Sequence, residues 1–305
     1  MNMNLESIEI ERQKKLKSFK ILFFPSLIIA VVSLVVALLM DSENQVRYVF
    51  FVLCAVFAML MLVAVLVPSS QYSKFCKKDL EMIVLKDVFK DAKQFEYYES
   101  NKLDYKDLAR SKLLRSPYKF KTFDTLYTDY KDVEIILTNF DFITLETHTD
   151  SEGHTHTTEE HHYGRYIEFN LEKTFDYELA IVEKGNNPQI ICSKPFKEKV
   201  EFESVDFNKK FTCTCNDKQT AYVLIQPKEM VEFLDMHKDY KGQISYSFIK
   251  KKVFFILNGT KTSISYNLFS KLSDKKINEV RSFYNLPIDV IDRLKLHKDK
   301  FNDID

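Results

Sequence analysis

Glycine and proline are scarce in this sequence, with 5 glycines and 7 prolines among 305 residues. A chain this poor in both residues, with 26 phenylalanines and 16 tyrosines, is typical of ordered structure rather than of flexible linkers. The same shortage argues against glycine-rich phosphate-binding loops. The sequence also contains no Walker A, GxGxxG, GxSxG or HExxH motif. We therefore predict no catalytic and no cofactor-binding residue, and we expect a protein that is not an enzyme.

An excess of charge of one sign is also missing, because 44 basic residues balance 44 acidic residues. A neutral chain lacks the positive charge that draws proteins to nucleic acid, so we expect no nucleic-acid partner. Cysteines are few, and none forms a CxxC pair. Cys213 and Cys215 would be neighbours on one strand face, which suits two small core residues better than a disulfide. The sequence predicts reduced thiols in a reducing compartment.

Long apolar runs, in contrast, are present. Residues 21–40 and 46–67 form two such runs, joined by the polar segment 41–45. A helix needs about 20 apolar residues to cross a hydrocarbon core about 30 Å thick, and both runs meet this length. A signal peptide has an apolar region of about 7–15 residues that ends at a small-residue cleavage site, which the first run does not match. We predict a transmembrane helical hairpin over residues 21–67.

Positive charge flanks this hairpin, whereas its connecting segment carries Asp41 and Glu43. Lysine and arginine mark the cytoplasmic flanks of membrane helices. The sequence thus predicts a multi-pass membrane protein with the basic segment 1–20 and both termini in the cytoplasm, and with the lipid bilayer as a partner. The flanking cations are Arg12, Lys14, Lys15, Lys17, Lys20, Lys74, Lys77 and Lys78.

Residues 72–305 have the patterns of a soluble α+β domain, which we expect on the cytoplasmic side. Alternating β-branched and aromatic residues predict mainly antiparallel strands, and apolar residues at three- and four-residue steps predict flanking helices. Strands are expected at 122–128, 133–149, 154–171, 178–183, 244–249 and 253–257, with a strand pair in 200–215. Helices are expected at 72–92, 105–114, 227–240, 274–284 and 287–298. The predicted fold class is α+β, a two-helix transmembrane hairpin followed by a sheet domain.

Several sequence blocks in this domain have a distinctive order and spacing. They are Leu103–Leu114 (LDYKDLARSKLL), Glu203–Phe211 (ESVDFNKKF), Val223–Leu234 (VLIQPKEMVEFL), Lys241–Leu257 (KGQISYSFIKKKVFFIL) and Phe283–Lys295 (FYNLPIDVIDRLK). Through them the chain resembles, over roughly residues 72–301, the bacterial Domain of Unknown Function 3137 family. The resemblance implies an N-terminal pair of membrane helices in a bacterial cytoplasmic (inner) membrane. It implies no activity and transfers no catalytic residue.

The most concentrated chemistry lies in Thr147–Tyr163 (THTDSEGHTHTTEEHHY). Gly153 suits the left-handed position of a three-residue hairpin loop, which would place His148 opposite His156 and bring three imidazoles onto one face near the tip. Imidazoles with nearby carboxylates are ligands for zinc and other divalent transition metals. The alternative is a solvated polar ribbon without a ligand. The candidate metal ligands are His148, His154, His156, His161 and His162.

Three functions are compatible with these features. The first is a membrane-anchored interaction or scaffold domain with a protein partner, which the tethering hairpin and the lack of catalytic motifs favour. The second is a metal-binding or metal-sensing membrane protein that uses the histidine-rich loop. The third is an unrecognised enzyme, because active sites can assemble from residues that are distant in sequence.

Overall fold

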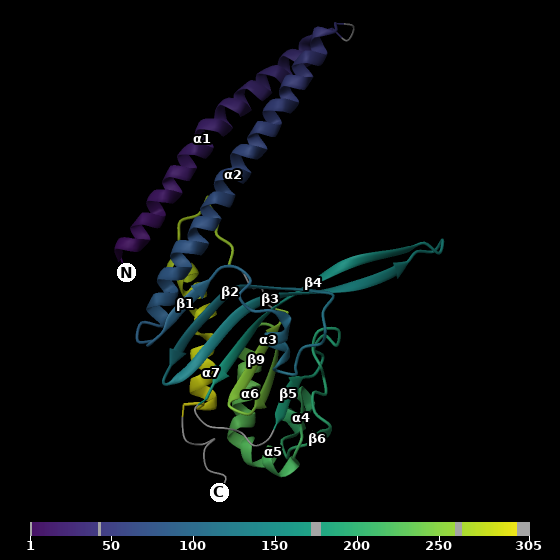
Figure 1. Ribbon diagram of the computed structural model, residues 1–305. Coiled ribbons are helices and arrows are strands. Elements are labelled where there is room, and N and C mark those ends of the chain that lie inside the picture. Colours follow the sequence, from purple (N-terminus) through teal and green to yellow (C-terminus); the bar gives the residue numbers. More distant parts are fainter. Residues whose placement is uncertain (1, 42–43, 172–177, 260–263, 298–305) are drawn as a thin grey trace. The chain divides into compact units, whose positions relative to one another are not determined.

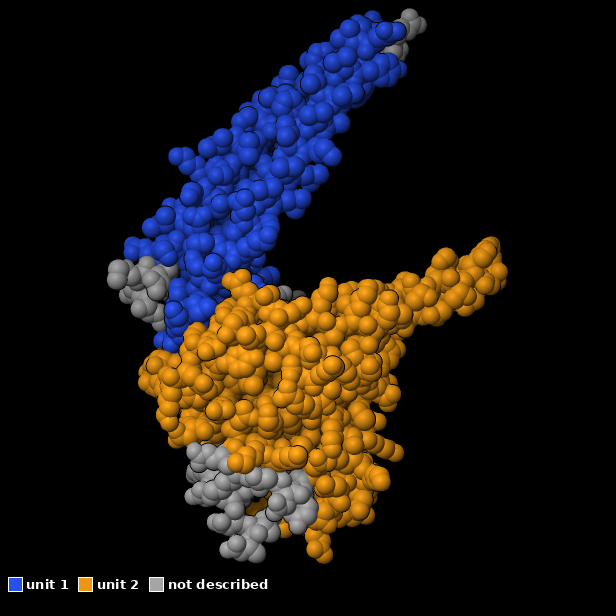
Figure 2. Space-filling view, viewed as in Figure 1, with its two compact units in different colours: residues 1–88, 264–284 blue, residues 89–263, 285–305 orange. Residues whose placement is uncertain are grey.

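The computed structural model describes residues 2–41, 44–171, 178–259 and 264–297. The chain divides into two compact units (Figures 1 and 2). The helical unit comprises Met1–Val88 and Ile264–Tyr284, and the sheet unit comprises Phe89–Ser263 and Asn285–Asp305. The expected fold class, α+β with two long apolar N-terminal helices and an antiparallel sheet, is confirmed.

Two long helices, α1 (Asn2–Leu39) and α2 (Val46–Val88), lie side by side in the helical unit (Figure 1). Both are long and apolar enough to cross a membrane. Both also continue beyond the apolar runs, because α1 includes the basic segment and α2 passes through Pro68 without ending. A proline inside a helix costs about 3 kcal/mol. The buried stripe of Tyr72, Cys76 and Leu80, spaced four residues apart, packs α2 after the proline, and the buried Ala64 packs it before the proline.

The apolar part of the helical unit buries small residues and exposes large ones. On α1, Ser26, Ala30, Ser33 and Ala37 are the buried positions, and Ala64 is buried on α2. The Ser26 hydroxyl donates to the carbonyl of Leu22 one turn earlier (2.7 Å), so it carries no unmet hydrogen bond there. Small residues at this spacing let two helix backbones approach closely, as they do in membrane helix pairs.

The segment 264–284 completes the helical unit by packing on α2. Glu81 of α2 is buried and accepts hydrogen bonds from the hydroxyls of Tyr266 (2.9 Å) and Tyr284 (2.6 Å). Burial, followed by the charge of Glu81, raises the pKa of Tyr266. On the other helix, Arg12 donates to the carbonyl oxygen of Leu268 (3.2 Å). Hydrogen bonds between residues far apart in sequence therefore hold the segment 264–284 against α1 and α2.

The described residues of the sheet unit form a nine-stranded sheet in which every neighbouring pair is antiparallel. The strand order is β1-β2-β3-β4-β9-β8-β5-β7-β6. The strands are β1 (Phe95–Tyr98), β2 (Lys119–Tyr130), β3 (Val133–Thr149), β4 (Thr155–Asn170), β5 (Leu179–Glu183), β6 (Glu198–Val200), β7 (Phe211–Cys215), β8 (Gln243–Ile249) and β9 (Lys252–Asn258).

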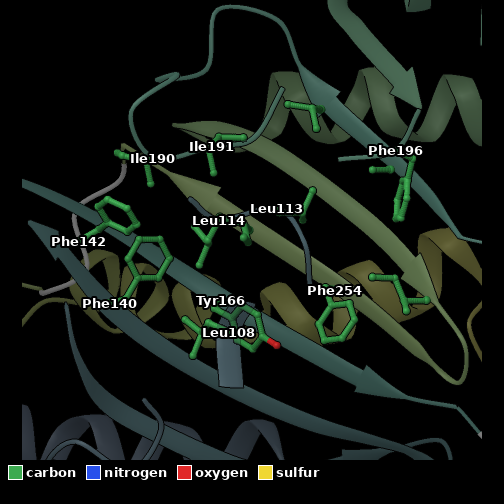
Figure 3. Packing of buried hydrophobic residues seen from close by; sticks show 14 residues of the cluster. Leu108, Leu113, Leu114, Phe140, Phe142, Tyr166, Ile190, Ile191, Phe196 and Phe254 are labelled. Carbon is green, nitrogen blue, oxygen red and sulfur yellow. The ribbon is translucent and has the colours of Figure 1, made fainter. Parts of the chain in front are cut away.

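The sheet buries apolar side chains on both faces. On one face, Phe140, Tyr166 and Phe254 belong to a cluster that is closed by α3 (Tyr105–Ala109) and the loops beside it (Figure 3). On the opposite face, the ring of Phe255 packs against Tyr246 (4.9 Å between centroids). Because successive strand residues point to opposite faces, central strands covered on both sides become continuous apolar runs.

Helices α4 (Val205–Lys210), α5 (Lys218–Leu224) and α6 (Pro227–Asp239) also belong to the sheet unit. Phe233 of α6 packs edge-on against Tyr246 of β8, with ring centroids 4.7 Å apart. Cys213 and Cys215 are free, buried thiols, as the sequence predicted. Burial raises the pKa of both thiols.

Several expected elements differ in detail. The helix expected at 72–92 is the last part of α2, and the helix expected at 105–114 ends at Ala109. The predicted strand pair in 200–215 contains the helix α4 between β6 and β7, because the Ser204 side chain caps this helix by accepting from the Phe207 backbone N–H (3.3 Å). The two predicted tail helices are one helix, α7 (Asp274–Leu294), which continues through Pro287. Buried residues on both sides of the proline, such as Leu286 and Val290, stabilise it. Lys298 and Phe301, where two sequence expectations ended, lie outside the described residues.

Candidate functional site

The β3–β4 hairpin continues past the sheet as a two-stranded arm, which stands out from the body of the sheet unit (Figure 2). The pairing of β2 with β3 reaches Ile143, and the pairing of β9 with β4 reaches Gly164. Beyond these points the two strands pair with each other from Thr144–Glu160 to Thr149–Thr155. All residues from 147 to 161 are exposed. We call residues 144–160 the arm.

Gly164 marks the base of the arm, because an aromatic ring covers it. Phe140 is its cross-strand partner, and a Cβ atom at position 164 would lie 2.3 Å from the Cζ atom of Phe140. Only glycine lets the ring pack so closely on the neighbouring backbone. Beyond this contact the core continues through Phe142 and Ile143, and the arm begins at the next residue of β3.

The turn at the tip is organised by Asp150. Its Oδ1 atom accepts hydrogen bonds from the backbone N–H groups of Glu152 (3.0 Å) and His154 (2.8 Å), which is an Asx-type turn. Gly153 has a φ of +85°, as the left-handed position of the predicted three-residue loop requires. The predicted register is confirmed, since His148 pairs with His156.

The tip histidines do not all face the same carboxylate. The Oδ2 atom of Asp150 lies 3.3 Å from His154 Nδ1 and 4.0 Å from His156 Nε2. His148 instead approaches Glu146, with Nε2 3.3 Å from Oε2. The three imidazoles are two-thirds or more exposed. The geometry thus brings Asp150, His154 and His156 together, whereas His148, directly opposite His156, contacts Glu146.

His161 and His162 lie at the base of the arm, away from the tip. His161 Nδ1 is 2.8 Å from Asp141 Oδ2, and His162 Nε2 is 2.9 Å from the Thr144 hydroxyl. Near them Lys119 pairs with Glu159 (2.5 Å), and this hydrogen bond lowers the pKa of Glu159. The five candidate ligands therefore form two groups. In the described part of the chain, no group of three His, Cys, Asp or Glu side chains is placed to hold a metal ion.

A buried polar network, which no local pattern predicted, crosses strands β1 to β4. Asp124 accepts a hydrogen bond from the Tyr97 hydroxyl (2.9 Å) and contacts the Asn139 amide (3.4 Å). Asn139 in turn accepts from Arg165 Nε (3.1 Å). Asp124 sits at an irregularity of β2 with a φ of +53°. Since Asp124, Asn139 and Arg165 are almost completely buried, we interpret this network as a structural link within the sheet.

An open groove of about 770 Å³ lies between the β6–α4 segment and helices α5 and α6. Its floor includes Phe202, Ile225 and Met230, and its rim includes Glu201 and Glu203. Glu201 pairs with Lys199 (2.7 Å), which lowers its pKa. The two charged residues that line the groove are therefore both carboxylates.

The model of one protein family, "Protein of unknown function (DUF3137)", matches residues 142–296, just over half of the chain. The chain belongs to this family. The match confirms the resemblance and contains four of its five sequence blocks, because Leu103–Leu114 precedes the matched range. It begins in β3 and includes the whole arm, so the arm is part of the region that defines membership.

No curated protein matches the chain. Among solved structures, it is similar to the crystal structure of the mycobacterial trehalose monomycolate transport factor A, with 10% sequence identity and a TM-score of 0.36. That similarity covers 72% of this chain and 96% of the mycobacterial chain.

Proposed function

We propose that this protein is a non-catalytic binding protein, anchored by α1 and α2 in a bacterial cytoplasmic membrane, which uses the arm to hold a protein partner. Both termini and the sheet unit lie on the cytoplasmic side in this proposal. The observation that carries the binding role is the arm itself, a paired ribbon whose residues 147–161 are exposed.

An isolated two-stranded ribbon gains little stability from packing, so the presence of the arm supports a functional role for it. A two-stranded hairpin without a packed face is only marginally stable in water. Here the Asp150 turn and the Lys119–Glu159 ion pair hold the ribbon in register. The projecting hairpin also presents two open strand edges, which a partner can extend by adding a strand.

The anchoring role is supported by the arrangement of side chains in the helical unit. Large apolar residues such as Leu22, Val56 and Leu62 are exposed, while Ala30 and Ser33 are buried between the helices. In water this arrangement would expose a continuous apolar surface, whereas in a bilayer it satisfies both the lipid and the helix contact. The basic flanks favour the cytoplasmic orientation.

The binding role can be tested with the full chain in native membranes. A photo-crosslinking residue at Thr157, on the arm, is expected to capture a discrete protein partner. The same residue at Val231, an exposed position of α6 (55% exposed), serves as the control. Replacing residues 146–158 with a two-residue Asn-Gly turn should remove the partner but leave the protein in the membrane. Equal capture at both positions, or capture that survives loss of the arm, would refute the arm as the contact surface.

A second candidate function is metal binding at the tip of the arm. The observation in its favour is that His154 and His156 both approach the Oδ2 atom of Asp150. Two imidazoles and one carboxylate are a suitable ligand set for zinc. Their side chains are exposed, so small rotations bring the three donor atoms to one point.

Calorimetric zinc titration of the full chain in detergent tests this candidate. The double variant His154→Ala/His156→Ala should lose a site that the wild type fills at micromolar zinc. The matched control is His161→Ala/His162→Ala, which removes the same number of imidazoles at the base of the arm. Absence of heat in the wild type, or equal losses in both variants, would count against a site at the tip.

A further inference from the structure

A small cavity with a mixed polar and apolar lining lies in the helical unit where α2 meets the segment 264–276. Its volume is about 200 Å³, and its lining includes Tyr72, Ser265, Ser270, Lys271, Ser273 and Lys276. The cavity is smaller than the roughly 300–1,000 Å³ sites that hold drug-sized molecules. Hydroxyl groups and ammonium groups supply hydrogen-bond donors and positive charge in a space of this size, which suits a small anionic group.

The two lysines differ in how their charge is used. Lys276 lies 2.9 Å from Glu279 and 5.8 Å from the centre of the Tyr266 ring. Lys271 is exposed, and its charge helps to lower the pKa of Glu9, after the larger effect of the Arg12 hydrogen bond. Acids near the cavity include Glu9, Glu279 and the buried Glu81, which accepts a hydrogen bond from the lining residue Tyr266. Glu279 offsets part of the charge of Lys276. Lys271 is the cation best placed to attract an anion into the cavity.

The cavity lies beside the end of the apolar part of the hairpin. Phe269, which precedes Ser270, is half exposed, and its ring contacts Phe19 of α1 edge-on with centroids 5.1 Å apart. The ring of Phe19 also packs against the ring of Phe23, with centroids 4.8 Å apart, and Phe23 lies in the first turn of the apolar run 21–40. Aromatic residues gather at the boundary between hydrocarbon and water. Tyr72, which lines the cavity, stands four residues after Pro68, about 6 Å further along α2.

Lysines are numerous near this end of the apolar runs, and two of them, Lys14 and Lys15, pair with Glu11. Lys15 of α1 donates to the side chain of Gln71 (2.8 Å), and further lysines follow on both helices at positions 14, 17, 20, 74, 77 and 78. Basic residues beside membrane helices attract the anionic lipids of the cytoplasmic leaflet. For a cavity near the end of the apolar runs, a lipid headgroup is therefore a more readily available source of phosphate than the solution.

We propose that the cavity binds the phosphate-bearing headgroup of an anionic phospholipid, with Lys271 and the serine hydroxyls as its ligands and Phe269 inserted beside the acyl chains. This inference rests on the proposed membrane anchoring and deepens it. The segment 264–276 then acts as a third membrane contact, in addition to α1 and α2.

Native mass spectrometry of the full chain in detergent tests the site. Phosphatidylglycerol and phosphatidylcholine with the same acyl chains are added in separate titrations. The wild type is expected to retain phosphatidylglycerol in preference to phosphatidylcholine. Lys271→Ala should weaken phosphatidylglycerol binding about fivefold, which corresponds to the energy of one lysine near an anionic surface. Lys271→Arg keeps the charge and should restore binding.

The matched control is Lys275→Ala, which removes an exposed lysine four positions away that does not line the cavity. Unchanged binding in this variant is expected. Equal affinity for the two lipids, or equal losses in Lys271→Ala and Lys275→Ala, would overturn the site. Inorganic phosphate that displaces the lipid at equal concentration would overturn the lipid assignment in favour of free phosphate.

Alkaline extraction of native membranes separates this inference from the proposed function. A chain that remains in the extracted membranes but binds both lipids equally refutes the cavity alone. A chain that is released from the membranes refutes the anchoring as well.

Discussion

The helical unit and the sheet unit bury opposite kinds of side chain. In the apolar part of the helical unit, Ala30 and Ala37 lie inside and Leu62 lies outside. In the sheet unit, rings such as Phe140 and Phe233 are completely buried. Water drives large apolar groups inward and lipid tails do not, so the sheet unit suits water and the helical unit suits the bilayer of the proposed anchoring. One chain therefore contains two opposite packing arrangements, small residues inside the apolar part of the helical unit and large rings inside the sheet unit.

The largest effect is expected from removing a ring inside the sheet unit. Phe233→Ala should lower the free energy of unfolding of that unit by about 3–5 kcal/mol, because it leaves a cavity beside Tyr246. Leu62→Ala, at a position 63% exposed in the helical unit, should change little. Thermal unfolding followed by tyrosine fluorescence measures both. Val231→Ala is the control on α6, and a loss as large as that of Phe233→Ala would contradict the packing described.

A charge on the outer face of α2 distinguishes a lipid-facing surface from a water-facing one. Val56→Lys places an ammonium group near the middle of the second apolar run, which costs about 2.5–3.5 kcal/mol in a bilayer. The fraction of the chain that inserts into membranes during in vitro translation should fall. Tyr222→Lys, at an exposed position of the sheet unit, should leave insertion unchanged. Full insertion of Val56→Lys would contradict a lipid-facing surface on α2.

The contact between α1 and α2 can be tested by adding volume. Ala30→Leu should destabilise the helix pair by about 1–3 kcal/mol, because the buried alanine has no space for a larger side chain. Val31→Leu, at the exposed neighbouring position, should have no such effect. Stability in detergent, measured as the denaturant midpoint of helix loss, reports the difference. Indistinguishable midpoints would show that small residues do not set this contact.

The smallest effect is a pH dependence in the helical unit. A hydrogen bond from Arg12 is the largest cause that lowers the pKa of Glu9 from its ordinary value of 4.5 to about 2. Because the folded-state pKa is below the unfolded value, this stabilisation is present above pH 4.5 and is lost as the pH falls toward 2. Glu9→Gln should therefore lower the unfolding temperature at pH 6 more than at pH 2.5. Glu6→Gln, at an exposed position, is the control. If both variants showed the same pH dependence, the Arg12–Glu9 ion pair would be excluded as its source.

Local patterns predicted much of this fold. The alternation in residues 133–149 gave both ends of β3, and Gly153 with its polar neighbours gave the loop and the register at the tip. Patterns failed where tertiary packing outweighed a local signal. Pro287 predicted a helix start, yet α7 continues through it because Leu286 and Val290 are buried on either side. The helix α4 is short, and its capping by Ser204 was hidden among residues that also suit a strand.

The candidate sites show the same division. The histidine-rich loop is visible in the sequence, but the separation of His161 and His162 from the tip follows from where β2 and β9 stop pairing with the hairpin. The cavity beside Tyr72 was not predictable, because its other walls come from residues about 200 positions later in the chain. The contact of Phe19 with Phe269 joins residues that no local periodicity connects.

The sequence by itself determined the two apolar runs, their basic flanks, the α+β class and the family blocks, because each depends on composition and short-range periodicity. Only the tertiary structure decided that the segment 264–284 returns to α1 and α2, that the hairpin extends past its sheet neighbours as an arm, and that a cavity lies beside Phe269. These features depend on contacts between residues that are distant in sequence. Packing and burial set the free energy of such contacts, and they produce no short-range periodicity in the sequence.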